Sequence, residues 1–235
     1  MPPLLSLAVS LERVQERIHA ALRCAGRSDA VTLVAVTKTV APERIGEAYR
    51  CGLRHFGENR VQEFDAKRPL LTLPATTWHL VGHLQSNKAR RAVELFDCVE
   101  SLDSSHLADR LERFAAAAGK RLPVLLQLHL GDEAAKFGVA EADLLPLAEH
   151  VASLPHLELR GLMLLPPYFD DPEQVRPFFR RLRQLAEELA RRLIPGLPRP
   201  ELSMGMSHDF EVAIEEGATI VRLGTALFGP RPGKP

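Results

Sequence analysis

The stretch Val31-Thr-Leu-Val-Ala-Val-Thr-Lys-Thr39 decides the fold. Residues 31–36 form an apolar, β-branched run, which is short enough to be a strand buried on both faces. Polar residues follow at once, and residues 42–51 then predict a helix with proline in its first turn. A buried strand, a polar turn and a helix in this order are the start of a parallel β/α arrangement.

The same alternation continues outward from this stretch along the chain. Seven more strands are predicted at residues 53–56 (stopped by Gly57), 77–81, 97–100, 123–128, 157–163, 201–203 and 219–221. Helices are predicted at residues 59–67, 86–95, 104–118, 141–151, 174–192 and 208–216. Pro177 should start or bend the helix over residues 174–192. An amphipathic helix over residues 4–24 precedes the first strand, with Leu7, Leu11, Val14, Ile18 and Leu22 on one face.

Eight strand and helix units within about 200 residues are what a closed barrel requires. We therefore expect an α/β fold, a single (β/α)8 TIM barrel with an extra N-terminal helix, that occupies residues 1–235 as one domain. An open, doubly wound sheet is the alternative, but its glycine-rich first turn, GxGxxG, is missing.

Composition narrows the class of function. Lys and Arg number 30 and Asp and Glu also number 30, so the chain lacks the basic excess of a typical nucleic-acid-binding protein. No apolar run approaches the ~20 residues of a membrane span, and residues 1–20 lack a signal-peptide core. Three widely spaced cysteines without a CxxC pair argue against disulfides and a zinc site. A soluble, cytoplasmic protein with no metal site, no membrane partner and no nucleic-acid partner is expected.

Lys38 is the first candidate site residue. In a β/α barrel the chemistry lies on the loops after the strands, and Lys38 follows an apolar strand directly. Desolvation at the barrel mouth disfavours the charged form of a lysine, which would make Lys38 a Schiff-base nucleophile. The alternative is an ordinary lysine that reaches solvent from a strand end.

The loops after the last two strands form the second candidate. Ser203-Met-Gly-Met-Ser207 is expected to open a helix with Ser207 as its cap, and Gly224-Thr225 offers backbone N–H groups and a hydroxyl. Phosphate sites in barrels commonly lie after strands seven and eight. The alternative is that both glycines serve only the backbone geometry of their turns.

Together these features suggest pyridoxal 5′-phosphate held at both ends, by Lys38 and by a phosphate cradle. Arg222, which we expect in the loop after strand eight, could meet the pyridine nitrogen. The alternative for Arg222 is a salt bridge to Glu201 or Asp209.

At these residues the chain resembles the pyridoxal-phosphate homeostasis proteins, the YggS/PROSC family. Six segments between Leu33 and Gly229 carry the resemblance. They are Val34-Ala-Val-Thr-Lys-Thr39, Phe56-Gly-Glu-Asn59 with Val61-Gln-Glu63, Trp78-His-Leu-Val-Gly-His-Leu-Gln-Ser-Asn-Lys88, Arg160-Gly-Leu-Met163, Leu202-Ser-Met-Gly-Met-Ser207 and Val221-Arg-Leu-Gly-Thr-Ala-Leu-Phe-Gly229. Six segments in this order are far more specific than any one of them.

The resemblance implies a barrel of the alanine-racemase N-terminal type, with the cofactor bound to Lys38 as an internal aldimine. It also implies roles for eight further residues: the phosphate would be held by Ser203, Ser207, Gly224 and Thr225, the ring nitrogen by Arg222, and the pocket would be lined by Asn59 and Met163 with His79 nearby. His79, beside a tryptophan, could instead be purely structural. The chain departs from the family pattern at Arg60 and His208, which puts only details of the rim in doubt.

Whether the cofactor is used for catalysis is a separate question. Racemases of this type need a second acid/base group, a tyrosine from an added domain. Here the predicted barrel takes up almost all 235 residues, so we expect no such domain. An arginine at the ring nitrogen also weakens the electron sink. We expect a non-catalytic carrier in vitamin B6 homeostasis, a monomer that contacts apo-enzymes transiently. A weak amino-acid racemase, with Tyr168 or a solvent-fed base on the second face, is the alternative. A third is a nucleic-acid or protein-binding module using residues 88–91, although such a charge run is more often a solvated helix face.

Overall fold

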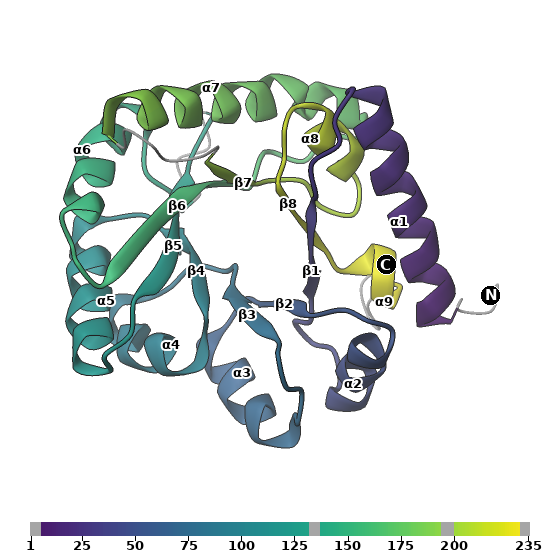
Figure 1. The fold of residues 1–235 in the computed structure, drawn as a ribbon, viewed down its shortest axis with the longest axis horizontal. Helices are drawn as coiled ribbons and strands as arrows, with labels where there is room; N and C mark the ends of the chain where they lie inside the picture. Colours follow the sequence, from purple (N-terminus) through teal and green to yellow (C-terminus); the bar gives the residue numbers. More distant parts are fainter. Residues whose placement is uncertain (1–5, 132–136, 194–199, 231–235) are drawn as a thin grey trace.

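A computed structural model describes residues 6–131, 137–193 and 200–230 of the chain. Eight parallel strands close into a barrel in the order of the sequence, with β8 hydrogen-bonded back to β1 (Figure 1). The strands are β1 Thr32–Val36, β2 His55–Glu58, β3 Thr77–Leu80, β4 Cys98–Leu102, β5 Leu122–Leu128, β6 Leu157–Leu164, β7 Glu201–Ser203 and β8 Ile220–Leu223. The predicted barrel is confirmed.

Helices surround the barrel on its outer side (Figure 1). They are α1 Leu7–Cys24, α2 Pro42–Arg50, α3 Val61–Lys67, α4 Ala89–Leu95, α5 Ser105–Ala117, α6 Glu141–Ala152, α7 Arg176–Leu193, α8 Phe210–Glu215 and α9 Thr225–Phe228, with short 3-10 turns η1 Arg68–Leu70, η2 Ser86–Lys88 and η3 Pro172–Val175. Among the helices that can be described, none has the length and apolar character to cross a membrane. Residues 4 and 5 of the predicted first helix lie outside the described residues.

Alternation along the strands separates two cores. Ala35 and Phe56 belong to the large core between the barrel and its helices. Val34, the neighbour of Ala35, instead packs with Leu125, Met163 and Ile220 in a second, small cluster. Because successive side chains of a strand point to opposite faces, this small cluster lies inside the barrel. Polar side chains occupy the rest of the interior.

Four strands run past their predicted ends, and in β6 the extension is a single residue, Leu164. Gly57 does not stop β2 but lies within it. A glycine suits this position because a Cβ there would come within 2.9 Å of Val34 Cγ1 in the barrel interior. β4 continues through Glu100, and β8 continues through Arg222, which therefore lies in the strand and not in the loop after it. The predictions ended these strands at the first glycine or near a charged residue, but a barrel interior accommodates both.

The last helices also differ from the prediction. α8 begins at Phe210 with Asp209 as its N-cap residue, so the prediction that Ser207 caps this helix is wrong. The Asp209 carboxylate accepts the N–H of Met206 at 2.6 Å, which holds the chain before α8 in a turn. The prediction also missed α9. Pro177 lies in the first turn of α7 and starts that helix, as expected.

α1 lies against the seam where the barrel closes. Its N-cap Ser6 accepts the N–H of Val9, and its buried face packs on α8 and α9, as Figure 1 shows. Just beyond α1, the Arg27 guanidinium donates to the carbonyl oxygens of Ile214 and Ala218. Ile214 lies in α8 and Ala218 lies between α8 and β8, so Arg27 ties the chain after α1 to the chain that enters the last strand.

Candidate cofactor site

Lys38 lies at the carboxyl end of β1. The Thr37 N–H donates to the Gly57 carbonyl at 2.8 Å, so pairing with β2 continues up to the residue before Lys38. Lys38 has the same alternation as Val34, which faces the barrel interior. Its side chain is half-buried, and continued alternation predicts that it is directed to the mouth of the barrel. This is the position that the sequence predicts for it.

A chain of buried polar side chains crosses the barrel interior. The Arg222 guanidinium donates to Ser203 Oγ at 2.5 Å and to the Leu164 carbonyl at 2.8 Å. Ser203 donates in turn to Glu100 Oε2 at 2.5 Å, and Glu100 Oε1 lies 2.7 Å from His79 Nδ1. We call these four side chains, together with His55, the interior network.

Burial and charge oppose each other within this network. Burial alone would raise the pKa of the Glu100 carboxyl, but the His79 hydrogen bond, the charges of His79 and Arg222 and the Ser203 hydroxyl lower it below its ordinary value. Burial also lowers the pKa of the Arg222 guanidinium, against the attraction of Glu100 and Asp209. The result is a buried carboxylate that faces a buried cation 4.0 Å away.

His55 continues the network toward β2. Its Nδ1 lies 3.1 Å from His79 Nε2, so one of the two rings donates and the other accepts. Burial, and next the charge of His79, lower the pKa of His55. The tautomers of the two rings decide the direction of this hydrogen bond: a neutral His79 that donates from Nδ1 to Glu100 accepts at Nε2 from the Nδ1–H of His55.

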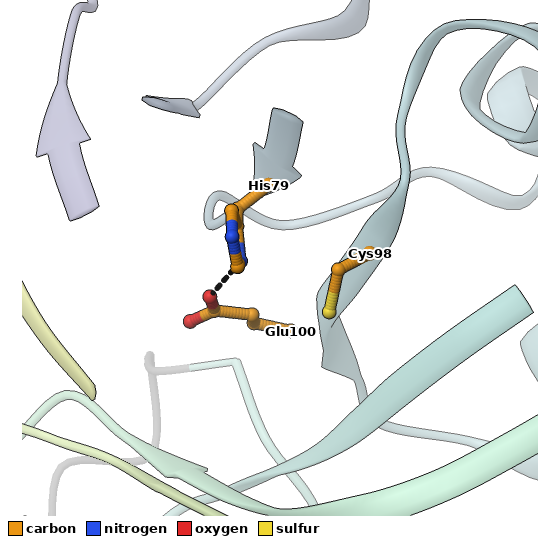
Figure 2. Close-up of side chains that lie close together, drawn as sticks. All are labelled: His79, Cys98 and Glu100. Carbon is orange, nitrogen blue, oxygen red and sulfur yellow. Dashed lines mark hydrogen bonds and ion pairs between the residues drawn. The ribbon is translucent and has the colours of Figure 1, made fainter. Parts of the chain in front are cut away.

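Cys98 lies beside this pair, on the same strand as Glu100, and Figure 2 shows the three side chains together. One potential ligand atom from each of His79, Cys98 and Glu100 falls within 4.8 Å of the others. The His79–Glu100 hydrogen bond already occupies two of these atoms. Burial, and then the negative charge of Glu100, raise the pKa of the Cys98 thiol, which keeps it protonated. We therefore treat the group as part of the hydrogen-bonded interior and assign no metal to it.

The salt bridge considered for Arg222 from the sequence has a different partner. Among the described residues, the carboxylate within ion-pair distance is that of Glu100, which the sequence did not single out. Glu201 lies 3.9 Å from Arg160 instead. Glu100 could have been noticed as an acidic residue among apolar neighbours, but its partner Ser203 is 103 positions away in the sequence.

The residues predicted to hold phosphate fall into two groups. Ser207 Oγ accepts the N–H groups of Gly224 at 3.3 Å and Ala226 at 3.1 Å, and the exposed Thr225 lies between them. These residues form one turn at the mouth, near Val36. Ser203 is fully buried and bonded to Arg222 and Glu100, so it is separated from this turn by its place in the interior network.

The two pocket residues lie in different surroundings. Met163 is fully buried in the barrel interior, in register with Ser203 across β6 and β7. Asn59 lies after β2 and lines a cavity of about 710 Å³ at the rim. The other residues around this cavity are Arg60, Val61, Gln62, Glu63, His83, Leu84, Gln85 and Lys88.

The departures from the family pattern lie on the rim. Arg60 precedes α3 and faces the same cavity as Asn59. His208 Nε2 lies 3.1 Å from the Phe169 carbonyl, and its ring is 5.3 Å from that of the exposed Tyr168.

In the charge run 88–91, Arg91 pairs with Asp65 at 2.5 Å and with Glu94 at 2.6 Å. This run includes an ion-paired helix face.

Known proteins resemble this chain over nearly its whole length. The family model of the alanine racemase N-terminal domain matches residues 9–232. A pyridoxal phosphate homeostasis protein of Aquifex aeolicus is 48% identical over 222 residues, which is 94% of this chain and 96% of its own. One of Escherichia coli K12 is 44% identical over 230 residues, covering 96% and 97%.

Solved structures agree with these matches. The structure of PipY from Synechococcus elongatus with PLP bound is 41% identical, with a TM-score of 0.83 over 95% of this chain and 100% of its own. An alanine racemase of Corynebacterium glutamicum, 20% identical with a TM-score of 0.66 over 97% of this chain and 63% of its own, shares the fold. The chain belongs to the family of pyridoxal phosphate homeostasis proteins, which are built on the alanine racemase N-terminal domain.

Proposed function

We propose that this protein binds pyridoxal 5′-phosphate at the mouth of the barrel and serves in intracellular vitamin B6 homeostasis, without robust catalysis. The observation that carries the proposal is the family membership over more than nine-tenths of the chain. The placement of Lys38 at the mouth supports it, and so does PipY, a relative solved with PLP bound.

The side chains around the mouth fit such a group. A primary amine, a turn with hydroxyl and N–H groups, and a buried guanidinium match an aldehyde, a phosphate and a ring nitrogen in chemical type. Lys38 would hold the cofactor covalently through Nζ, while Ser207, Gly224 and Thr225 would hold its phosphate. When bound, the cofactor supplies an aldehyde that condenses reversibly with a primary amine and releases water.

Three further residues complete the proposed site. Asn59 and Met163 would line the pocket at the rim and in the interior. Ser203 was assigned to the phosphate from the family resemblance, and that assignment stays a prediction. Its hydrogen bonds favour a second role, which is to orient Arg222. His79 would support the same guanidinium through Glu100.

Arg222 bears on the lack of catalysis. A guanidinium stays protonated at physiological pH, so Arg222 would donate a hydrogen bond to the ring nitrogen and leave that nitrogen unprotonated. An unprotonated ring withdraws electrons weakly and stabilises carbanions poorly. The protein would then hold and release its cofactor, and would act as a monomeric carrier in the cytoplasm that contacts apo-enzymes transiently.

Reduction with borohydride tests the site. The protein is incubated with pyridoxal phosphate, reduced, digested and mapped by mass spectrometry. We expect the label on Lys38, and no label in the Lys38→Ala variant. A label on another lysine would contradict the site assignment.

An activity assay tests the carrier role against the racemase alternative. Purified protein loaded with cofactor is incubated with single amino-acid enantiomers, and the products are separated by chiral chromatography. We expect no robust turnover. Turnover that is lost in Lys38→Ala and in Tyr168→Phe would establish the racemase instead.

A further inference from the structure

Three charged side chains outside the barrel wall hold the main chain on both sides of Lys38. They are Glu58 at the end of β2 and Glu63 and Lys67 on α3, and we call them the Lys38 clamp. None of them belongs to the interior network or to the turn of Ser207, Gly224 and Thr225, which we call the phosphate turn after its proposed role. Glu58 and Glu63 belong to segments that mark the family resemblance, but the proposed cofactor contacts leave both without a role.

On the far side of Lys38, the clamp holds Thr39. The Thr39 N–H donates to Glu63 Oε1 at 2.6 Å. Thr39 has a φ of +61°, a left-handed conformation that is costly for a β-branched residue. Such a conformation persists only where the surroundings fix it, and the hydrogen bond to Glu63 is a contact that fixes it.

On the near side, the clamp holds Thr37. Lys67 Nζ donates to the Thr37 carbonyl at 2.9 Å, and the buried Thr37 hydroxyl donates to Glu58 Oε1 at 2.7 Å. Lys67 also donates to Glu63 Oε1 at 2.6 Å and to Glu58 Oε1 at 3.1 Å. One ammonium group therefore joins the two carboxylates and ties both flanks of Lys38 to the same helix.

The helix that supplies the clamp is itself anchored. Phe64, the residue after Glu63 on α3, is fully buried. Its ring centroid lies 4.3 Å from that of Trp78 and 4.9 Å from that of Phe96. Glu63 and Lys67 are four residues apart, which places them on one face of the helix. The aromatic contact fixes that face relative to the strands, so the clamp can hold the loop to a defined position.

We propose that Glu63 and Lys67 are positioning residues for Lys38: they fix the backbone on both sides of it so that its Nζ is directed into the mouth. This inference rests on the proposed function, since it assigns a purpose to the position of the lysine that would hold the cofactor. A shift of about 1 Å in a reacting group can lower a rate by as much as ~10²-fold, so a loosened loop should slow covalent attachment.

The test compares Glu63→Ala with Asp65→Ala. Both residues are ion-paired carboxylates on α3, but Asp65 pairs with Arg91 on the surface, away from the loop. Attachment of pyridoxal phosphate is followed by its absorbance change in stopped flow. We expect Glu63→Ala and Lys67→Met to slow attachment roughly tenfold or more, with Asp65→Ala close to the unaltered protein. Equal rates for Glu63→Ala and Asp65→Ala would overturn the proposal.

A second arm separates positioning from a general loss of structure. The same substitutions are made in the Lys38→Ala background, and noncovalent affinity for pyridoxal phosphate is measured by calorimetry. We expect Lys67→Met to leave this affinity within about twofold, because Lys67 is not among the residues that line the rim cavity and because Ser207, Gly224 and Thr225 lie on other loops. A loss of noncovalent affinity in the Lys38→Ala background as large as the loss of attachment rate with Lys38 present would show a merely structural role. Failure of the unaltered protein to label Lys38 would instead refute the proposed function itself.

Discussion

At the scale of single residues, the barrel interior is held by pairs that no local pattern shows. The carboxylate of Glu100 is buried on β4, and its partners come from β3, β7 and β8. A buried ion pair stabilises little by itself, but removing one partner leaves the other charge without compensation. Glu100 therefore compensates the buried charge of Arg222 and helps to hold its guanidinium in place.

The pKa of Glu100 gives a prediction on acid stability. Its folded pKa lies below the ordinary value of about 4.3, so its stabilising effect is present above that value and is lost as the pH falls through the folded pKa. Glu100→Gln should lower the free energy of unfolding by about 3 kcal/mol at neutral pH. It should also flatten the decline in stability that sets in as the pH falls below about 4.3. Urea unfolding at several pH values measures both; parallel pH profiles for the two proteins would contradict the assignment.

Ser207 gives a prediction on ligand selectivity. Its hydroxyl accepts the N–H groups of Gly224 and Ala226, and it can still donate its own proton to a phosphate oxygen. The double variant Ser207→Ala, Thr225→Ala should weaken binding of pyridoxal phosphate at least tenfold, since each bond to a charged group contributes about 1.5–3 kcal/mol. Pyridoxal without phosphate serves as the control ligand, and equal losses for both would remove these residues from the phosphate site.

At the scale of elements, hydrophobic runs predicted the order of strands and helices, because each run shows a local period. The ends of strands could not be predicted in the same way. Glu100 and Arg222 are charged, which suggests a strand end, yet both stand inside strands because their partners lie across the barrel. Ser207 was assigned to the nearest helix, whereas its hydrogen bonds reach a turn 17 positions away.

The place of Lys38 at the end of β1 could be predicted from the sequence because its signal is local, a lysine that follows an apolar strand. The residues that hold it could not be found, since Lys67 lies 30 positions from Thr37 and meets it only after the barrel has formed. Glu58 and Glu63 stood out only as parts of a family segment, which gave no indication of what they contact.

Gly82 tests how closely the loops after β2 and β3 must pack. A Cβ at Gly82 would lie 2.2 Å from the Asn59 carbonyl oxygen. Gly82→Ala should therefore displace the Asn59 backbone, lower stability by about 1–3 kcal/mol and weaken cofactor binding. In Gly46→Ala, the matched control within α2, the nearest atom is 3.5 Å away at the end of a flexible arginine. That variant should be more stable by about 0.5–1 kcal/mol. Thermal unfolding compares them, and equal melting temperatures would contradict the expected clash.

At the scale of the whole molecule, α1 joins the first and last parts of the barrel. It packs on α8 and α9, on either side of the strand that carries Arg222. Gly224 lies between β8 and α9 and donates to Ser207, so the position of this turn depends on the same packing. A helix that precedes the barrel in the sequence thereby supports loops at the opposite end of the chain.

Leu11 measures this support. It is 5% exposed on the buried face of α1, and Leu11→Ala should lower the free energy of unfolding by about 2–5 kcal/mol. The exposed Val9 of the same helix provides the control, since Val9→Ala removes little buried surface. Urea unfolding followed by circular dichroism measures both. A loss at Leu11 no larger than that at Val9 would show that α1 adds little to the closed barrel.

The pairing of β1 with β8 also has a consequence for biosynthesis. Val34 and Arg222 are neighbours in the barrel but stand near opposite ends of the sequence. While the ribosome is still making the chain, β1 has already emerged, and its partner strand, Arg222 and the Gly224 turn do not yet exist. If the proposed function holds, an unfinished or truncated copy has Lys38 but lacks Arg222 and the Gly224 turn, the other two proposed contacts of the cofactor. Cofactor retention would then distinguish finished molecules from unfinished ones.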